Sequence, residues 1–197
     1  GTSALAERVY AVTQNQTLIS FDSATPGTIL TGTALWNTQS NERIRGIDFR
    51  PATGELYALG SFSNLYTINL GTGMATRVGG GSFTPSLNGS SFGFDFNPTI
   101  DRIRVVSDAN QNLVLNPITG AATVATSLFY AAGDVNQGMD PNVVGSAYSN
   151  NFVGAATSQL YGLDTGLDVL VKQANSAGAL TTVGPLGVNI SDTSGFD

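Results

Sequence analysis

A pattern of thirteen residues occurs twice in this chain, 47 residues apart, and it limits the fold more than any other feature. The copies are residues 46–58 and 93–105, and both open with Gly-x-Asp-Phe-x-Pro before a short apolar run. Each is followed by a strand-like segment ending in Asn, a Thr-Gly turn and a further strand-like segment. Self-similarity at a period of about 20 to 50 residues is typical of repeat architectures. The chain should therefore consist of stacked copies of one four-stranded unit.

The repeat can be followed along the chain by its leading glycines. Gly46, Gly93, Gly145 and Gly195 are separated by 47, 52 and 50 residues. Short β-branched and aromatic runs, interrupted by Gly, Asn, Asp or Pro, follow the first three, which is the pattern of strands and turns. The expected strands are 8–13, 18–22 and 29–34 in the first unit, 45–49, 56–59, 65–69 and 75–79 in the second, 92–96, 103–107, 113–116 and 121–126 in the third, and 143–148, 159–164, 168–173 and 180–184 in the fourth.

These units predict an all-β fold, a β-propeller-like ring of four-stranded antiparallel blades with a repeat of about 47–52 residues. The repeat units are residues 8–43, 44–90, 91–142 and 143–189, followed by 190–197, in a single domain of residues 1–197. The glycine-led strand of each unit should be innermost, because crowding at the axis favours close backbone approach. Alternating Tyr and Leu positions on the next two strands should pack between blades.

Residues 190–197 repeat the opening strand of a unit, since Ser194-Gly195-Phe196-Asp197 matches residues 92–95. We therefore expect a β-strand there, and two arrangements would accommodate it. The strand could pair with the three-stranded first unit and close a four-bladed ring. It could instead open the fifth blade of a ring that is truncated at the C-terminus. An open blade edge at this point would favour self-association, because unpaired strand edges pair with other chains.

The composition of the chain excludes several classes of function. The net charge is −6, and the eight bases are seven Arg and Lys172, with no basic run, so we expect no binding of nucleic acid. The chain has no Cys and no His, which excludes thiolate chemistry and Ser-His-Asp catalysis. No apolar run reaches the roughly 20 residues of a membrane span. Few Lys with many Thr, Asn and Gly suggests an exported protein, extracellular or periplasmic, in its mature form without a signal peptide.

The repeated motifs resemble a bacterial family known only as domain of unknown function 4394. The resemblance covers residues 9–197, and its most specific stretch is 93–116, with Phe94-Asp95-Phe96-Asn97-Pro98 followed by residues 102–107. It implies an exported, often extracellular, propeller-like repeat protein. Family members typically continue for another blade beyond the position of Asp197, which favours the truncated ring. The resemblance implies no activity and no catalytic residues.

Three acids occupy the same place in the repeated opening strands: Asp48, Asp95 and Asp197. On a propeller, inner-strand carboxylates could line the channel and surround a cation. We instead interpret them as structural, accepting hydrogen bonds from the backbone or from Arg between blades, because a residue that recurs in every unit usually serves the unit. Asp48 and Asp95 lie between apolar residues, so we expect them to be buried and hydrogen-bonded.

A second candidate site is the loop Asp134-Val-Asn136-Gln-Gly-Met-Asp140, which places oxygen side chains at alternate positions. Calcium loops use this spacing because it turns several oxygens inward on one short segment. The match is incomplete, since the glycine comes one place early and no bidentate Glu follows. Asp and Asn are also ordinary turn residues, so we expect weak calcium binding at most.

Two further features could bind a ligand. Arg102 and Arg104 lie two residues apart on one strand and could grip a carboxylate or sulfate, although such pairs more often neutralise buried acids, here Asp95 and Asp108. Trp36 lies in a polar loop between units and is the aromatic residue best placed to stack on a sugar.

The sequence therefore predicts a non-catalytic extracellular binding or structural module of unknown ligand, with a carbohydrate or a protein as its partner. The sequence indicates no cofactor, and calcium binding remains an alternative. One alternative is a carboxylate-based hydrolase or lyase, assisted by calcium, that acts at the propeller channel. Another is a subunit of an extracellular assembly that pairs through an open blade edge.

Overall fold

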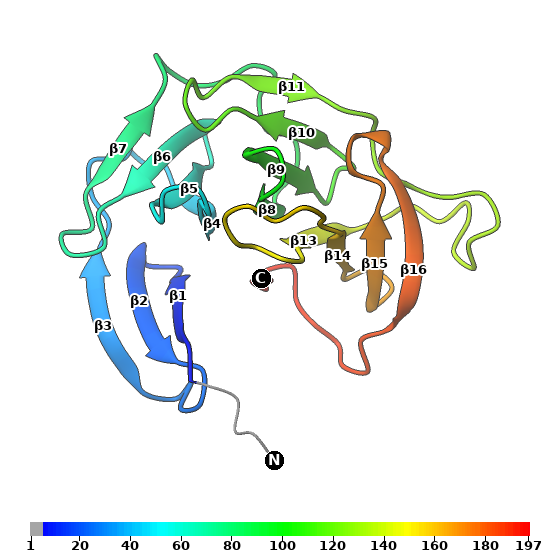
Figure 1. Cartoon of the computed structure of the whole chain (residues 1–197), viewed down its shortest axis with the longest axis horizontal. Coiled ribbons are helices and arrows are strands. Elements are labelled where there is room, and N and C mark those ends of the chain that lie inside the picture. The colour runs from blue at the N-terminus through cyan, green and yellow to red at the C-terminus, as the bar shows by residue number, and fades with distance from the viewer. Residues whose placement is uncertain (1–5) are drawn as a thin grey trace.

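The protein forms a ring of four small β-sheets, seen in Figure 1 in a computed structural model that describes residues 6–197. The elements are β1 (Arg8–Val12), β2 (Thr17–Asp22), β3 (Ile29–Ala34), β4 (Ile44–Phe49), β5 (Leu56–Gly60), β6 (Asn64–Ile68), β7 (Ala75–Val78), β8 (Phe92–Asn97), β9 (Arg102–Ser107), β10 (Asn112–Leu115), β11 (Ala122–Val124), β12 (Phe129–Tyr130), β13 (Val143–Tyr148), β14 (Leu160–Asp164), β15 (Val169–Gln173), the 3₁₀ turn η1 (Asn175–Ala177) and β16 (Ala179–Pro185).

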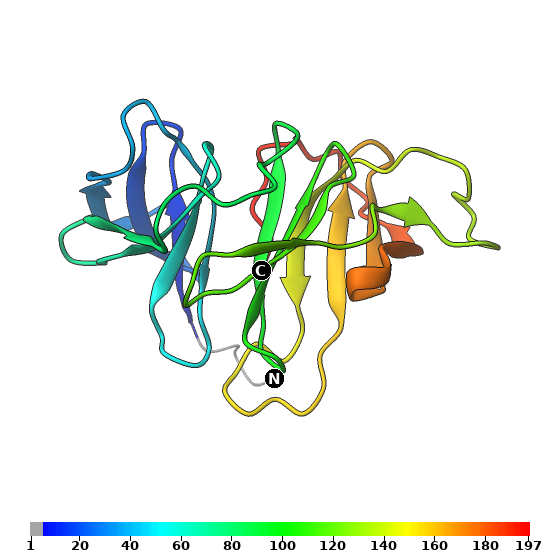
Figure 2. The ribbon, with the colours of Figure 1, turned by 90° about the horizontal axis from the view of Figure 1, so that it is seen from above.

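Each sheet is built mainly from consecutive antiparallel strands. The orders are β1-β2-β3, β4-β5-β6-β7, β8-β9-β10-β11 and β13-β14-β15-β16, with β12 added parallel to β16 at the outer edge. The first strand of each sheet lies innermost, and β8 packs between β4 and β13 (Figure 1). Figure 2, the view from above, shows the sheets standing side by side across the width of the molecule. This confirms the prediction of an all-β, four-bladed propeller arrangement with a three-stranded first blade.

The core lies between neighbouring blades, because both faces of a blade are covered. Every residue of β5 is buried, and its side chains alternate between two apolar clusters. Leu56 and Ala58 face the cluster shared with the first blade, whereas Tyr57 and Leu59 face the cluster shared with the third. Successive side chains of a strand point to opposite faces, so one strand can contribute to both interfaces. The expected packing of Tyr and Leu between blades is confirmed.

The leading glycines permit close approach of the inner strands. A Cβ at Gly46 would lie 2.6 Å from Cβ of Phe94 on the next inner strand. At Gly93 it would lie 2.4 Å from Oγ of Ser146 and 2.8 Å from the backbone of β13. The glycines that open the second and third units are thus explained by contact with the following blade, whereas a Cβ at Gly195 would meet nothing within 4 Å.

Replacing Gly93 should therefore loosen the contact between β8 and β13. We expect Gly93→Ala to lower the free energy of unfolding by about 1–3 kcal/mol, because the new methyl group meets the backbone of β13 as well as Oγ of Ser146. Gly184→Ala is the matched control, since nothing lies within 4 Å of a Cβ at that strand position. Urea denaturation of both variants checks this, and equal stabilities would contradict the close-approach explanation.

The prediction of a β-strand at residues 190–197 is wrong. No strand is assigned there, and the segment turns at Ser191–Ser194, where the Ser194 N–H donates to the Ser191 carbonyl at 3.1 Å. Side-chain hydrogen bonds, rather than a β-ladder, attach this segment to the fourth blade. Asp192 accepts hydrogen bonds from Thr165 and Asn142. A strand needs a partner edge, and none pairs with this segment among residues 6–197. The C-terminus still reaches the centre of the ring (Figure 1).

Candidate functional site

Two acids on the inner strands are buried at the axis of the ring. Asp48 on β4 is 6% exposed, and Asp95 on β8 is 1% exposed. The Phe96 N–H donates to Oδ2 of Asp48 at 2.7 Å, and the Tyr148 N–H donates to Oδ1 of Asp95 at 2.9 Å. Each acid thus accepts a backbone hydrogen bond from the inner strand of the next blade. The predicted burial and hydrogen bonding of Asp48 and Asp95 are confirmed.

The series of acids is interrupted in the fourth blade and completed by the C-terminal segment. Ala147 occupies the acid's place on β13, two residues after Gly145. Asp197 instead approaches from the C-terminal segment, so that one carboxyl oxygen from each of Asp48, Asp95 and Asp197 lies within 4.8 Å of the others. Asp197 is the exposed member of this axial acid cluster, and the other two are buried.

The surroundings favour the protonated form of the buried pair. Burial raises the pKa of both Asp48 and Asp95 well above their ordinary value, and it outweighs the backbone hydrogen bonds that oppose it. The Asp48 carboxylate adds a repulsion that raises the pKa of Asp95 further. Burial also raises the pKa of Asp197, with a contribution from Glu7. In the absence of a cation, the acids therefore resist ionising together.

Two buried oxygen atoms near the axis have no hydrogen-bond partner among residues 6–197. One is Oδ2 of Asp95, and the other is Oγ of Ser146, on a residue that is 1% exposed. Ser146 follows Gly145 on β13, where the other inner strands carry an apolar residue such as Ile47. Buried polar groups in proteins are nearly always paired, so unpartnered atoms at one place call for an explanation.

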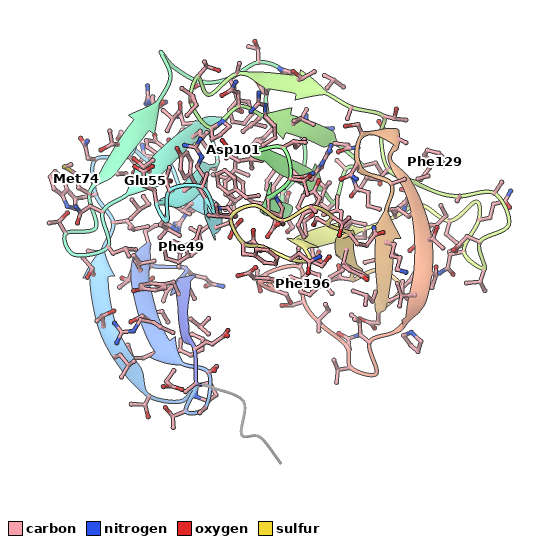
Figure 3. The ribbon with its side chains drawn as sticks, viewed as in Figure 1. Phe49, Glu55, Met74, Asp101, Phe129 and Phe196 are labelled. Carbon is pink, nitrogen blue, oxygen red and sulfur yellow. The ribbon has the colours of Figure 1, made fainter. Side chains whose placement is uncertain are left out.

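A cavity of about 650 Å³ opens between the inner strands and the C-terminal segment. Asp48, Ser146 and Asp197 line this cavity. Asp95 does not line it, but one of its carboxyl oxygens lies within 4.8 Å of an oxygen of Asp48 and of Asp197. Aromatic side chains form part of the wall, and Figure 3 shows Phe196 near the centre of the ring. Two exposed cations, Arg8 and Arg45, also line the cavity. The site thus combines aromatic, acidic and basic groups in one open cavity.

The structure places the other predicted residues away from this cavity. We predicted that Arg104 would neutralise Asp95 or Asp108, and this prediction is wrong. The Arg104 side chain points toward other strands. Its guanidinium donates to Asn112 at 2.7 Å and to Ser176 at 3.3 Å. The carboxylate of Asp108 is occupied by the backbone N–H groups of residues 90 and 91.

Arg102 is half-buried and donates to the backbone carbonyl of Asp101 at 2.8 Å. The Asp101 carboxylate is bound by a different residue, Arg50, through two hydrogen bonds of 2.8 and 2.5 Å. That contact joins the end of β4 to the β8–β9 turn, and it holds the pKa of Asp101 below its usual range. This pair could not be predicted from local patterns, because its two residues are 51 positions apart.

The Asp134–Asp140 loop directs its acids to different partners. Both oxygens of Asp134 accept hydrogen bonds from Thr182, at 2.7 and 2.8 Å, and Asn136 also donates to Thr182. Asp140 instead accepts a hydrogen bond from Asn110 at 2.6 Å. These contacts anchor the loop to β16 and to the β9–β10 turn. Asp134 and Asp140 thus bind different parts of the protein, and calcium binding at this loop stays a prediction.

Trp36 lies on the outside, between the first and second blades. It is 51% exposed, and its indole N–H donates to the Thr72 carbonyl at 2.9 Å, while its backbone bridges to Met74. About half of its surface is available to solvent, but it is not among the residues that line the axial cavity. Stacking of a sugar on Trp36 stays a prediction.

Sequence reasoning missed a buried glutamate, Glu42, in the loop before β4. It is 5% exposed and accepts hydrogen bonds from the Phe62 N–H at 2.9 Å, the Asn64 amide at 2.9 Å and the Tyr66 hydroxyl at 2.5 Å. These donors belong to β6 and the turn before it, so Glu42 fastens the loop to the second blade. A polar loop residue gives no sequence signal of this role.

The family assignment follows from a match along most of the chain. A family described as "Domain of unknown function (DUF4394)" matches residues 17–197. The chain belongs to this family. The resemblance noted in the repeated motifs is thereby confirmed. No curated protein matches this DUF4394 chain closely enough to count as a relative.

A solved structure shares the fold at low sequence identity. A crystal structure of an auxiliary nutrient binding protein from Bacteroides ovatus ATCC 8483 is 15% identical, with a TM-score of 0.52 over 88% of this DUF4394 chain and 46% of the other. The corresponding protein from Bacteroides thetaiotaomicron VPI-5482 is 14% identical, with a TM-score of 0.49 over 89% and 46%. This chain thus spans about half the length of the solved structures that it matches.

Proposed function

We propose that this domain is an exported, non-catalytic module that binds a small polar ligand of the carbohydrate class in the axial cavity. The observation that carries the proposal is the cavity of about 650 Å³, in which Asp48, Asp197 and Arg45 meet aromatic walls. Ligand pockets of about 300–1,000 Å³ typically combine apolar walls with a few polar groups that fix orientation. The cavity of this domain has that size and composition.

The lining suits a sugar better than an apolar molecule. Phe49, Phe94 and Phe196 offer aromatic surface, against which the apolar face of a sugar ring can pack. Carboxyl groups accept hydrogen bonds from hydroxyls, and a guanidinium donates to them. The protein from Bacteroides ovatus, whose fold is shared, is named as a nutrient binding protein, and that name supports a binding role.

Export is part of the proposal. It rests on the scarcity of Lys, the abundance of Thr, Asn and Gly, and the lack of Cys. Among residues 6–197, no helix is long and apolar enough to span a membrane.

Thermal shift and calorimetry against a panel of monosaccharides and oligosaccharides test the function. We expect at least one sugar to raise the melting temperature of the parent, and Arg45→Ala to weaken its binding about tenfold, the loss of one charge-assisted contact. Arg45 is exposed, so the variant should fold normally. Lys172→Ala is the control, because it removes an exposed cation of β15 that does not line the cavity.

Trp36→Ala distinguishes the two candidate surfaces. If this variant abolishes sugar binding while Arg45→Ala leaves it unchanged, the ligand binds at the junction of the first two blades and the axial proposal is wrong. Failure of every sugar to bind the parent would also count against the proposal.

One observation favours a second candidate, a glycoside hydrolase or lyase. Retaining glycosidases use two carboxyl groups about 5–5.5 Å apart, one of them protonated at neutral pH. Asp48 and Asp95 approach this spacing, and their raised pKa values keep a proton available. Cleavage products released by the parent but not by Asp95→Asn would replace the binding role with this one.

A further inference from the structure

We propose that Asp48, Asp95 and Asp197 together bind one divalent cation of the calcium class at the axis of the ring. The site would take one carboxylate from β4, one from β8 and one from the C-terminal segment. It goes beyond the sugar-binding role and does not depend on it.

The spacing of the oxygens fits such an ion. One carboxyl oxygen from each acid lies within 4.8 Å of the others. Calcium holds its oxygen ligands at about 2.3–2.6 Å, so two ligands on opposite sides of the ion are about 4.6–5.2 Å apart. All three side chains can therefore ligate one ion with little movement of the strands that carry them.

Unpartnered oxygen atoms supply an independent indication. Oδ2 of Asp95 is buried and accepts no hydrogen bond from residues 6–197, while Oδ1 of the same group is held by the Tyr148 N–H. One oxygen of Asp95 is thus fixed by the backbone, and the other has no partner in a group whose neighbours are Asp48 and Asp197. Oγ of Ser146, which also lines the cavity, is buried and unpartnered as well.

No salt bridge on the described part of the chain involves these acids. The one salt bridge found among residues 6–197 joins Arg50 to Asp101, and neither residue belongs to the cluster. Three neighbouring carboxyl groups in a low-dielectric site repel one another and remain costly to ionise. A divalent cation removes that cost, and an all-oxygen donor set without His or Cys selects a hard ion.

The ion would also give the C-terminal segment its attachment. Residues 190–197 form no ladder with a neighbouring strand, yet Phe196 packs against Gly145 of β13, and Asp197 reaches the acids of β4 and β8. Ligation by Asp197 therefore links three segments that the backbone does not pair. Binding of the ion should stabilise the whole ring, because the unfolded chain offers no preformed site.

Isothermal titration calorimetry with calcium chloride tests the proposal on the full chain after removal of metal with a chelator, at pH 8. We expect one calcium ion per chain, and an affinity at least tenfold weaker in Asp197→Asn and in Asp95→Asn. Asp197 is exposed, so its variant should fold even if Asp95→Asn does not. Asp134→Asn is the control and should leave the affinity unchanged, because that carboxylate is already bound by Thr182.

Calcium binding that is weakened in both cluster variants and kept in the control supports the site. The proposal is overturned if the parent binds no calcium up to about 10 mM, or if Asp197→Asn and Asp95→Asn bind as tightly as the parent. Binding that disappears in Asp134→Asn alone would place the ion in the Asp134–Asp140 loop and would also overturn it.

Discussion

Without divalent cations, the protein is expected to lose stability as the pH rises from about 4 to about 8, because of Asp48 and Asp95. Burial raises the folded-state pKa of both groups, whereas the unfolded chain ionises them near the ordinary value of 3.8. Their contribution is fully present below that value and is lost as the pH rises toward the folded-state values. A pKa shift of one unit corresponds to about 1.4 kcal/mol, so even a partial shift of the two groups makes the loss several kcal/mol.

Asp95→Asn isolates this effect from the other ionisable groups. The amide oxygen can still accept the Tyr148 N–H, but the side chain cannot ionise beside Asp48. In chelator at pH 8 we expect the variant to be more stable than the parent by about 2–4 kcal/mol, on the same scale of about 1.4 kcal/mol per pKa unit. Near pH 4 the difference should nearly vanish. Urea denaturation at both pH values measures it.

Asp101→Asn is the control, because its stability should depend on pH in the opposite direction. Hydrogen bonds from Arg50 lower the pKa of Asp101, so its contribution is present above its ordinary pKa and is lost as the pH falls. This variant should be less stable than the parent at pH 8, and the difference should shrink at low pH. If Asp95→Asn behaved in the same way as Asp101→Asn, the buried pair would not be protonated in the folded state.

Glu42→Ala is expected to lower the free energy of unfolding by about 3–5 kcal/mol, the usual cost of breaking a buried network. The substitution leaves the Phe62 N–H, the Asn64 amide and the Tyr66 hydroxyl without their acceptor in a buried site. Each unsatisfied buried donor costs about 1–3 kcal/mol. Thermal and urea denaturation measure the loss.

Two variants sharpen this test. Glu55→Ala removes an exposed acid of the same blade and should change the stability by less than about 0.5 kcal/mol. Glu42→Gln keeps the size of the side chain but turns an amide NH₂ toward one of the donors, so an intermediate loss is expected. A Glu42→Ala protein as stable as Glu55→Ala would show that water replaces the carboxylate at no cost.

Much of the fold could be predicted because the repeat encodes it locally. The period of about 47–52 residues, the alternation along residues 56–59 and the leading glycines are all properties of neighbouring residues. The same repeat pointed to Asp48 and Asp95 as equivalent, buried inner-strand residues. It could not show that each acid accepts the backbone N–H of the following blade, since that contact depends on how the blades rotate against one another.

The wrong predictions concern segments whose structure depends on contacts with residues far away in the sequence. Residues 190–197 carry the sequence of an inner strand, but no edge within the described residues 6–197 pairs with them, and their contacts are side-chain hydrogen bonds. Arg104 lies opposite Asp95 in the strand register, yet its long side chain reaches Asn112 and Ser176 instead. Sequence spacing gives the face of a strand but not the reach of a flexible side chain.

The central claim is that the inner-strand acids meet as a buried, uncompensated cluster at the axis. Carbon-13 NMR of the aspartate carboxyl groups during a pH titration of the metal-free protein tests it most directly. We predict that two aspartate signals titrate well above the ordinary range, and that Asp48→Asn shifts the remaining one, Asp95, to lower pH because a repelling neighbour is gone. The claim is contradicted if every aspartate carboxyl titrates below about pH 5, within the usual spread of such groups.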